Sequence, residues 1–198
     1  MEKALEQLVT ALTELPGIGE KTALRIAFFL LRQSRVAERL TVAVANAREK
    51  LHECPICQNL TEDRLCSICA DGSRDHHTIC VVEEPADVLT LEQTHRYRGV
   101  YHVLGGVLSP IDNIGPRDLN ISTLLERVAT GGIAEVILAT NPTVEGEATA
   151  SYVYHQLQSY PIKVTRLARG LPTGVDIGIA DLDTLSRAFD DRRDLTTP

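Results

Sequence analysis

The chain contains no tryptophan, and aromatic residues make up only 4% of its 198 residues. Aliphatic side chains must therefore form most of any core, and a hydrophobic content of 43% is enough for one large or two small cores. No apolar run approaches the about twenty residues that cross a bilayer, which excludes a membrane span. The N-terminus lacks the charged stretch and apolar block of a secretory signal, so we expect a cytoplasmic protein.

Cysteine is also scarce, with five residues in the whole chain. In a protein expected inside the cell, cysteines indicate metal binding or plain burial, and disulfide bonds are not expected. The sequence also lacks internal repeats and low-complexity tracts. The cysteines therefore become candidates for a metal site.

Positive charge is in short supply overall, since the net charge is −7, and this argues at first against a nucleic-acid-binding protein. The charge is unevenly distributed, however. Residues 1–53 carry eight basic and seven acidic residues, which leaves the other 145 residues with a net charge of −8. Residues 21–50 hold seven basic residues and two acidic ones. Because charges further apart than about one Debye length, ~8 Å, are screened, a local basic segment can bind phosphate while the acidic body does not.

Leucine and valine recur at helical spacing close to the N-terminus and predict a first helix over residues 2–15. The turn Pro16–Gly19 interrupts this pattern. A second helix is predicted over Lys21–Gln33 and a third over Val36–His52. The sequence therefore predicts a small all-helical region before residue 54.

The turn between the first two helices has the features of a phosphate-binding hairpin. Gly17 and Gly19 flank one apolar residue, which lets the backbone turn sharply and approach a ligand closely. Lys21 stands at the start of the second helix, where free amide groups and the positive dipole end favour anions, and Arg25 and Arg32 follow on the same face. The segment resembles the helix-hairpin-helix motif, which contacts the DNA backbone without reading bases. The alternative is an ordinary corner between two helices with solvated basic side chains.

Four of the five cysteines form the strongest metal signal in the chain. Two pairs, each with two intervening residues, are separated by eight residues: Cys54, Cys57, Cys66 and Cys69. Two such pairs complete a tetrahedral thiolate shell, with Zn–S distances of about 2.3 Å and no open position for water. The pattern therefore predicts a structural Zn²⁺ that folds a segment too short to have its own core.

Other interpretations of the cysteines remain open at this point. The thiols could be simply buried or could form a redox pair, and His52, His76 or His77 could replace one ligand. We expect Cys80, inside an apolar run, to be a core residue.

From residue 78 onward, apolar runs of strand length alternate with helical patterns, which predicts a parallel sheet flanked by helices. The predicted strands are Ile79–Val82, Gly99–Leu104, Glu135–Ala139 and Ile162–Leu167, and the predicted helices are Ala86–Gln93, Ser122–Thr130, Gly146–Ser159 and a short C-terminal one over Ile177–Phe189. The fold class is thus α+β with several domains.

Acidic residues follow the first and third of these strands, at the edge where α/β sheets place their sites. The arrangement resembles the Toprim domain, in which a glutamate and a DxDxxG segment bind Mg²⁺ for phosphoryl transfer. Glu83 matches the glutamate and Gly146 the glycine, but Asn141 and Thr143 replace the two aspartates. Because Mg²⁺ prefers anionic oxygen ligands, a phosphoryl-transfer centre is hard to build here.

Three interpretations of this acidic edge are open: a solvated surface, a site reused for binding other proteins, and residual metal-dependent catalysis. The candidates for partner binding are Glu83, Glu84, Asp87, Glu145 and Glu147. The chain contains no Walker A sequence and no evident tyrosine nucleophile domain, so we expect no catalytic residues.

In this order, the motifs resemble the RecR family of recombination mediators along essentially the whole chain. The tract Leu104–Pro110, the segment Leu171–Gly174 and the segment Asp183–Ala188 add to the resemblance. It implies four parts: a helix-hairpin-helix region (1–53), a four-cysteine zinc finger (54–77), a Toprim-like domain (78–170) and a C-terminal oligomerisation tail (171–198).

The resemblance also implies a function. RecR-like proteins act with RecO and, in many bacteria, RecF, and they help to load RecA onto single-stranded gaps and at double-strand breaks. It implies a cytoplasmic, nucleoid-associated homotetrameric ring that encircles DNA. It assigns sequence-independent binding of single- and double-stranded DNA to Lys21 and Arg25, zinc to the four cysteines and partner binding to the acidic edge. The competing hypotheses are a Mg²⁺-dependent Toprim enzyme and a zinc-ribbon interaction module without a nucleic-acid role.

Overall fold

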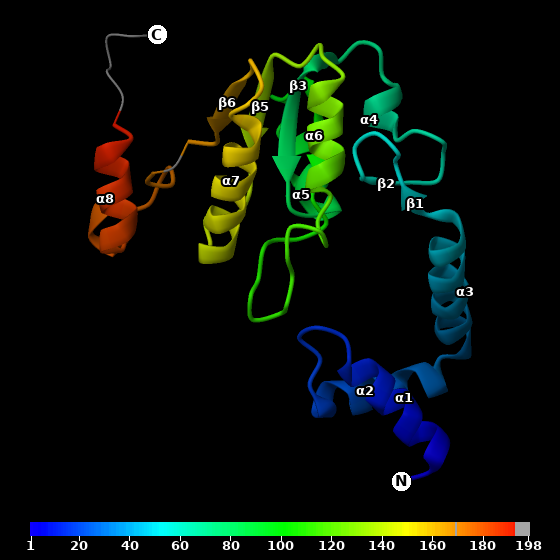
Figure 1. Cartoon of the computed structure of the whole chain (residues 1–198). Helices are drawn as coiled ribbons and strands as arrows, with labels where there is room; N and C mark the ends of the chain where they lie inside the picture. The colour runs from blue at the N-terminus through cyan, green and yellow to red at the C-terminus, as the bar shows by residue number, and fades with distance from the viewer. Residues whose placement is uncertain (169, 193–198) are drawn as a thin grey trace. The chain divides into compact units, whose positions relative to one another are not determined.

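The computed structural model describes residues 1–168 and 170–192, and these residues form two compact units, one of residues 1–51 and one of the described residues from 52 onward (Figure 1). The last six residues of the predicted C-terminal tail, 193–198, lie outside the described residues.

The first unit consists of α1 (Lys3–Thr13), α2 (Glu20–Arg32) and α3 (Ser34–Lys50). Its core is small and contains Val9, Ala23 and Ala27 with the partly buried Leu5, Leu8, Leu12 and Ile18 around them. All three helices were predicted. The third begins two residues earlier than expected, and it ends at Lys50 because Leu51 adopts an extended conformation. No residue of α3 is buried.

The second unit begins with a short cysteine-rich segment. Strand β1 (His52–Glu53) pairs antiparallel with β2 (Leu60–Thr61), and the one-turn helix α4 (Ser67–Ala70) follows. The four cysteines of this segment are buried and belong to the same core as the sheet that follows. The segment therefore packs as part of the larger domain.

The sheet has four parallel strands in the order β4-β3-β5-β6, as the alternating pattern predicted. Its strands are β3 (Asp75–Val82), β4 (Gly99–Val103), β5 (Glu135–Leu138) and β6 (Lys163–Arg166). The connecting helices are α5 (Pro85–Glu92), α6 (Ile121–Ala129) and α7 (Val144–Leu157). Figure 1 shows α6 and α7 side by side across one face of the sheet.

Strand β3 is central and begins earlier than predicted. Its apolar half, Ile79–Val82, is fully buried, but its first three residues are polar and exposed, so they give no apolar signal. Pairing of Asp75 with Gly99 on β4 extends the strand to this point. Long-range pairing therefore determines where the strand starts.

The predicted C-terminal helix is divided in two. A 3₁₀ turn, η1 (Ile177–Ile179), precedes α8 (Leu182–Asp190). Ala180 ends the first part, and Asp181 caps the second, since its Oδ1 accepts a hydrogen bond from the Thr184 backbone nitrogen at 2.9 Å. Among the described residues, no helix has the length and apolar composition of a membrane span.

His102 of β4 makes the stability of this fold depend on pH. Its side chain is fully buried, Nε2 donates to the Asn120 carbonyl at 2.8 Å, and Nδ1 has no partner among the described residues. Burial lowers the pKa of His102 from 6.5 to about 4. His102 binds a proton below about pH 6.5 in the unfolded chain but only below about pH 4 in the folded chain. The contribution of neutral His102 to stability is therefore complete above this pH range and is lost as the pH falls through it.

We expect the His102 contribution to reduce the free energy of unfolding by about 2–3 kcal/mol between pH 7 and pH 4.5. Urea titrations of the wild type and of His102→Gln at both pH values measure it, because the variant keeps every other titrating group. Equal losses of stability in the two proteins would contradict the prediction.

Candidate functional site

The hairpin between α1 and α2 has the backbone that the two glycines suggested. Gly17 has a φ of +77°, a conformation that disfavours side chains, so this position requires glycine. Gly19 has ordinary angles and is the N-cap of α2, where its carbonyl accepts from the backbone nitrogens of Thr22 and Ala23 at 2.9 Å each. A Cβ on either glycine would meet no atom within 4 Å. The first amides of α2 are therefore open to a ligand.

The predicted basic residues lie along one exposed side of α2. Lys21, Arg25 and Arg32 are all exposed, whereas Ala23 and Ala27 on the opposite side are buried against α1. None of the three basic side chains forms an ion pair with a residue that the structure describes. The hairpin thus combines an open helix N-terminus with unpaired positive charge, which suits a phosphate group.

The four predicted cysteines come together in the second unit. Their Sγ atoms all lie within 4.8 Å of one another, and the Sγ atoms of Cys57 and Cys66 are 3.4 Å apart. Tetrahedral Zn²⁺ with Zn–S bonds of about 2.3 Å requires sulfur atoms about 3.8 Å apart, so the four thiols fit the ion. Backbone amides support the sulfurs: Cys66 N donates to Cys54 Sγ at 3.5 Å and Cys69 N to Cys66 Sγ at 3.4 Å.

The thiols differ in how easily they lose a proton. A hydrogen bond from Cys69 lowers the pKa of Cys57 to about 5. Burial raises the pKa of Cys66 to about 11, and the hydrogen bond to Cys57 together with burial raises the pKa of Cys69. Of these three thiols, Cys57 therefore ionises most readily, and metal binding at the cluster would release the protons of Cys66 and Cys69.

The alternative ligands do not reach this cluster. His76 Nε2 lies 3.0 Å from the Asp71 carbonyl oxygen, and His77 Nδ1 contacts the Gly132 carbonyl oxygen. Cys80 is buried inside β3, as predicted, where burial raises its pKa to about 12. In the described part of the chain, the four cysteines are the one group of three or more potential ligands close enough to hold a metal ion.

The acidic edge of the sheet is built around Glu83. This carboxylate is only 8% exposed, its Oε1 accepts from the Asn141 backbone nitrogen at 2.7 Å, and its Oε2 accepts from Asn141 Nδ2 at 2.6 Å. Gly146 lies so close that an added Cβ would stand 2.2 Å from the Asn141 carbonyl oxygen and 2.8 Å from Glu83 Oε1. Amide groups therefore satisfy the carboxylate that a metal would otherwise bind.

The residue at the second lost aspartate position also has a structural role. Thr143 is the N-cap of α7, and its Oγ1 accepts from Gly146 N at 3.0 Å. Asn141 and Thr143, which stand in place of the two Toprim aspartates, thus both contribute hydrogen bonds to the loop between β5 and α7.

The remaining acidic candidates differ in exposure. Glu84 is exposed at the N-cap of α5, and its backbone nitrogen donates to Asp87 Oδ2 at 2.9 Å. Glu147 is paired with both terminal nitrogens of Arg166, at 2.7 Å each. Glu145 is half-buried at the start of α7. Glu84, Asp87 and Glu145 consequently have more freedom to contact another molecule than Glu83 and Glu147.

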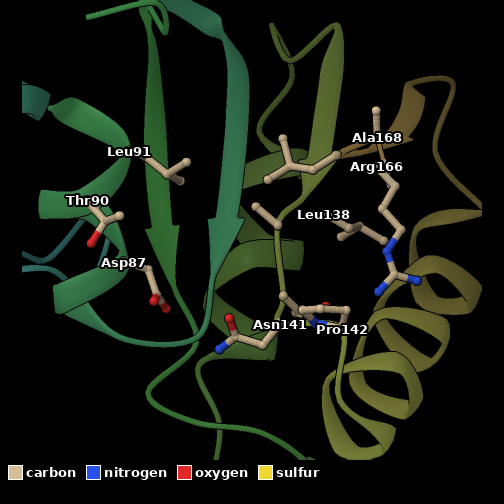
Figure 2. A pocket seen from close by; sticks show the side chains of 11 residues that line it. Asp87, Thr90, Leu91, Leu138, Asn141, Pro142, Arg166 and Ala168 are labelled. Atoms are coloured by element: carbon tan, nitrogen blue, oxygen red, sulfur yellow. The ribbon is translucent and has the colours of Figure 1, made fainter. Parts of the chain in front are cut away.

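Arg166 was missed by the sequence analysis. It lies at the carboxyl end of β6 and lines a hollow of about 290 Å³ with Asp87, Thr90 and Asn141 (Figure 2). In Figure 2, α5 contributes one side of the hollow and the end of β6 the other. A basic residue at the end of the fourth predicted strand was a usable signal, because all the parallel strands end at this edge.

Comparison with known families matches three segments of the chain. Residues 5–48 match the helix-hairpin-helix of RecR, residues 51–71 match the four-cysteine zinc finger domain of RecR, and residues 77–168 match the Toprim domain. The zinc site and the α+β fold class predicted from the sequence are thereby confirmed.

Several curated proteins are similar over nearly their full length. The Recombination protein RecR of Treponema denticola is 51% identical over 190 residues, which cover 96% of this chain and 97% of that protein. Those of Desulforudis audaxviator and Moorella thermoacetica are 50% and 52% identical, with 98% and 96% of each chain covered, respectively.

Proposed function

Since the chain belongs to the RecR family of recombination proteins, we propose that it is a non-enzymatic mediator that binds DNA through the hairpin of its first unit and other proteins through its Toprim domain. The observation that carries the non-enzymatic part is the pair of hydrogen bonds from Asn141 to Glu83. They replace a divalent cation with N–H donors at the position where Toprim enzymes would need the metal.

The DNA-binding part is supported by the exposed N-terminus of α2 and its unpaired basic residues. Such a surface contacts phosphates and not base edges, so binding would be independent of sequence and would include single- and double-stranded DNA. Gly17 and Gly19 shape the turn, Lys21 and Arg25 make the main contacts, and Arg32 extends them.

We expect the double substitution Lys21→Ala/Arg25→Ala to weaken DNA binding and to flatten its salt dependence. Each lost phosphate contact reduces the slope of log affinity against log salt by about 0.9 for duplex and about 0.7 for single strands. Fluorescence anisotropy with labelled DNA over a salt series measures both quantities. Arg96→Ala/Arg117→Ala is the matched control, because it removes two exposed positive charges from the acidic body. Equal binding by the two variants would rule out the hairpin as the DNA site.

Weak DNA binding by a single hairpin favours a ring of several copies. A shallow contact with few basic residues binds weakly, and several copies around one duplex multiply the affinity through effective concentration. Val36, Leu40 and Val44 form an exposed apolar stripe at four-residue spacing on α3, with exposures of 40%, 48% and 53%. This stripe supports oligomerisation, for which we propose a homotetramer. Light scattering with and without DNA measures the mass on which this part depends.

We propose RecO and RecF as the partners of the acidic edge and RecA loading as the outcome, in the cytoplasm at the nucleoid. The exposed Glu84 and the half-buried Asp87 and Glu145 are the first candidates for these contacts. We keep the four-part division at residues 53, 77 and 170 as a proposal for how the tasks are divided: DNA contact, zinc-stabilised structure, partner binding and oligomerisation.

A further inference from the structure

No described strand pairs with the outer edge of β4, and groups from outside the sheet form hydrogen bonds along it. Several of its backbone groups bind partners outside β3, among them the carbonyls of Gly99 and Tyr101 and the nitrogen of Val103. Arg74 Nη1 donates to the first at 3.1 Å, Arg127 Nη1 donates to the second at 2.7 Å, and Val103 N donates to the carbonyl of Cys57 at 2.8 Å. A cysteine of the zinc cluster and two arginines therefore share one strand edge.

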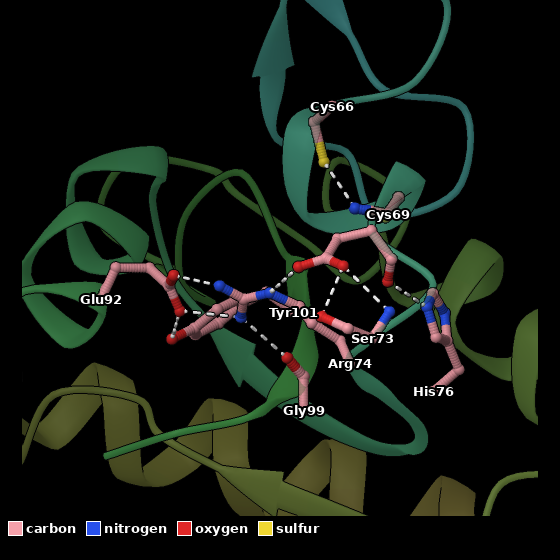
Figure 3. Close-up of polar contacts among 9 residues, drawn as sticks. Cys66, Cys69, Ser73, Arg74, His76, Glu92, Gly99 and Tyr101 are labelled. Atoms are coloured by element: carbon pink, nitrogen blue, oxygen red, sulfur yellow. Dashed lines mark hydrogen bonds and ion pairs between the residues drawn. The ribbon is translucent and has the colours of Figure 1, made fainter. Parts of the chain in front are cut away.

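The two arginines differ in how their charge is balanced. The Arg74 side chain is 13% exposed and is paired with Glu92, which also accepts from the Tyr101 hydroxyl (Figure 3). Figure 3 shows this network between the end of the cysteine-rich segment and the sheet. Arg74 thus has a carboxylate partner inside the same edge.

Arg127, on α6, forms no ion pair with any carboxylate of the residues that the structure describes. Burial lowers its pKa. Its hydrogen-bond acceptor, the Tyr101 carbonyl, lies two residues before Val103, whose nitrogen donates to the Cys57 carbonyl, so Arg127 and the cysteine cluster meet the same stretch of β4. A partly buried cation without a counter-charge is unfavourable, and guanidinium stays charged even so. Thiolates of the cysteine cluster at this strand edge can supply the counter-charge that Arg127 lacks.

We propose that Arg127 is the counter-charge of the four-thiolate zinc centre and a positioning residue that connects this centre to β4. Four thiolates around one Zn²⁺ carry a net charge of −2. The Arg127 guanidinium, held by the Tyr101 carbonyl on the strand edge that also binds Cys57, balances part of that charge. Partners behind the ligands of this kind tune metal affinity, although they do not touch the metal. The bound zinc and the sheet edge thereby stabilise each other.

Three substitutions separate the charge of Arg127 from its hydrogen bond. Arg127→Lys keeps the charge, Arg127→Gln keeps a donor for the Tyr101 carbonyl without the charge, and Arg127→Met keeps neither. Arg74→Met is the matched control, because it removes a second partly buried arginine from the same edge, one that already has a carboxylate partner. Zinc affinity is measured on full-length protein by equilibrium competition with a chromogenic chelator.

We expect Arg127→Gln and Arg127→Met to weaken zinc binding by about 10- to 100-fold, and Arg127→Lys and Arg74→Met to bind zinc as the wild type does. The absorption spectrum of the Co²⁺-substituted protein checks that the thiolate geometry is retained in each variant. If Arg127→Met does not fold, the Gln and Lys variants still decide the question. Zinc affinity of Arg127→Gln equal to that of Arg127→Lys would overturn the proposal.

Discussion

Replacement of Asn141 by aspartate should make the stability of the second unit depend on Mg²⁺ or on acid. Asn141 Nδ2 donates to Glu83 Oε2 at 2.6 Å, so the variant places two carboxylate groups in direct contact. Two unit charges at about 4 Å repel by about 4 kcal/mol at an effective dielectric constant of 20. Glu83 is 8% exposed, so little water relieves this repulsion. We expect the free energy of unfolding at pH 7 to fall by about 3–5 kcal/mol.

The loss should be smaller at acid pH, because a proton shared by the two carboxylates removes their repulsion, and smaller in millimolar Mg²⁺, because the cation gains two anionic ligands. Urea titrations at pH 7 and pH 5, with and without Mg²⁺, measure these effects.

Thr143→Asp is the control for Asn141→Asp. It adds a carboxylate to the same loop, but aspartate is as good an N-cap as threonine and lies exposed at the positive end of α7. We expect it to leave stability nearly unchanged. Wild-type stability of Asn141→Asp at pH 7 without metal would show that the amide is not what holds Glu83 in place.

Loss of the zinc ion should expose the outer edge of β4. Replacement of Cys66 by serine removes one of four ligands, and we expect the variant to lose its metal and residues 52–71 to unfold. The carbonyl of Cys57 then leaves the Val103 nitrogen, which has no strand on that side. The loss in unfolding free energy should reach at least ~3 kcal/mol, a part of the about 10–16 kcal/mol with which Zn²⁺ binds isolated fingers.

Hydrogen exchange resolved by residue measures this edge directly. The Val103 amide should exchange rapidly in Cys66→Ser, whereas the Leu104 amide, which donates to the Val82 carbonyl at 2.9 Å on the inner side, should stay protected. Cys80→Ser is a second control, because Cys80 lies in β3 outside the cluster and its loss should leave the zinc in place. A protected Val103 amide in zinc-free Cys66→Ser would contradict the prediction.

Local signals in the sequence were enough for the three N-terminal helices, the four parallel strands with their connecting helices, and the zinc site; they did not give β1, β2, α4 or the break between η1 and α8. The spacing of the cysteines, the glycine turn before Lys21 and the alternation of strands and helices after residue 78 all reflect short-range geometry. The contacts that define the acidic edge are different in kind. Glu83 and Asn141 are 58 residues apart, and Glu147 and Arg166 are 19 apart on separate elements, so no periodic pattern links them.

The burial of each side chain distinguishes acidic residues that the sequence could only treat as one group of candidates. Five acidic residues followed two strand ends, and all were candidates for partner binding. The fold places Glu83 inside and pairs Glu147 with Arg166, whereas Glu84 stays exposed. The position of Arg127 beside the cysteines likewise depends on how α6 packs against β4, which composition and spacing do not encode.

The two edge strands of the sheet determine how many other chains can add a strand to it. One side, β4, is blocked by the zinc finger and two arginines, and the other, β6, has no neighbouring strand among the described residues. If β6 alone is unpaired, strand pairing between copies stops at a dimer. Lys163 on β6 disfavours this dimer as well. A chain without its zinc finger has two unpaired edge strands. Strand pairing can then continue from copy to copy and lead to fibres or precipitates.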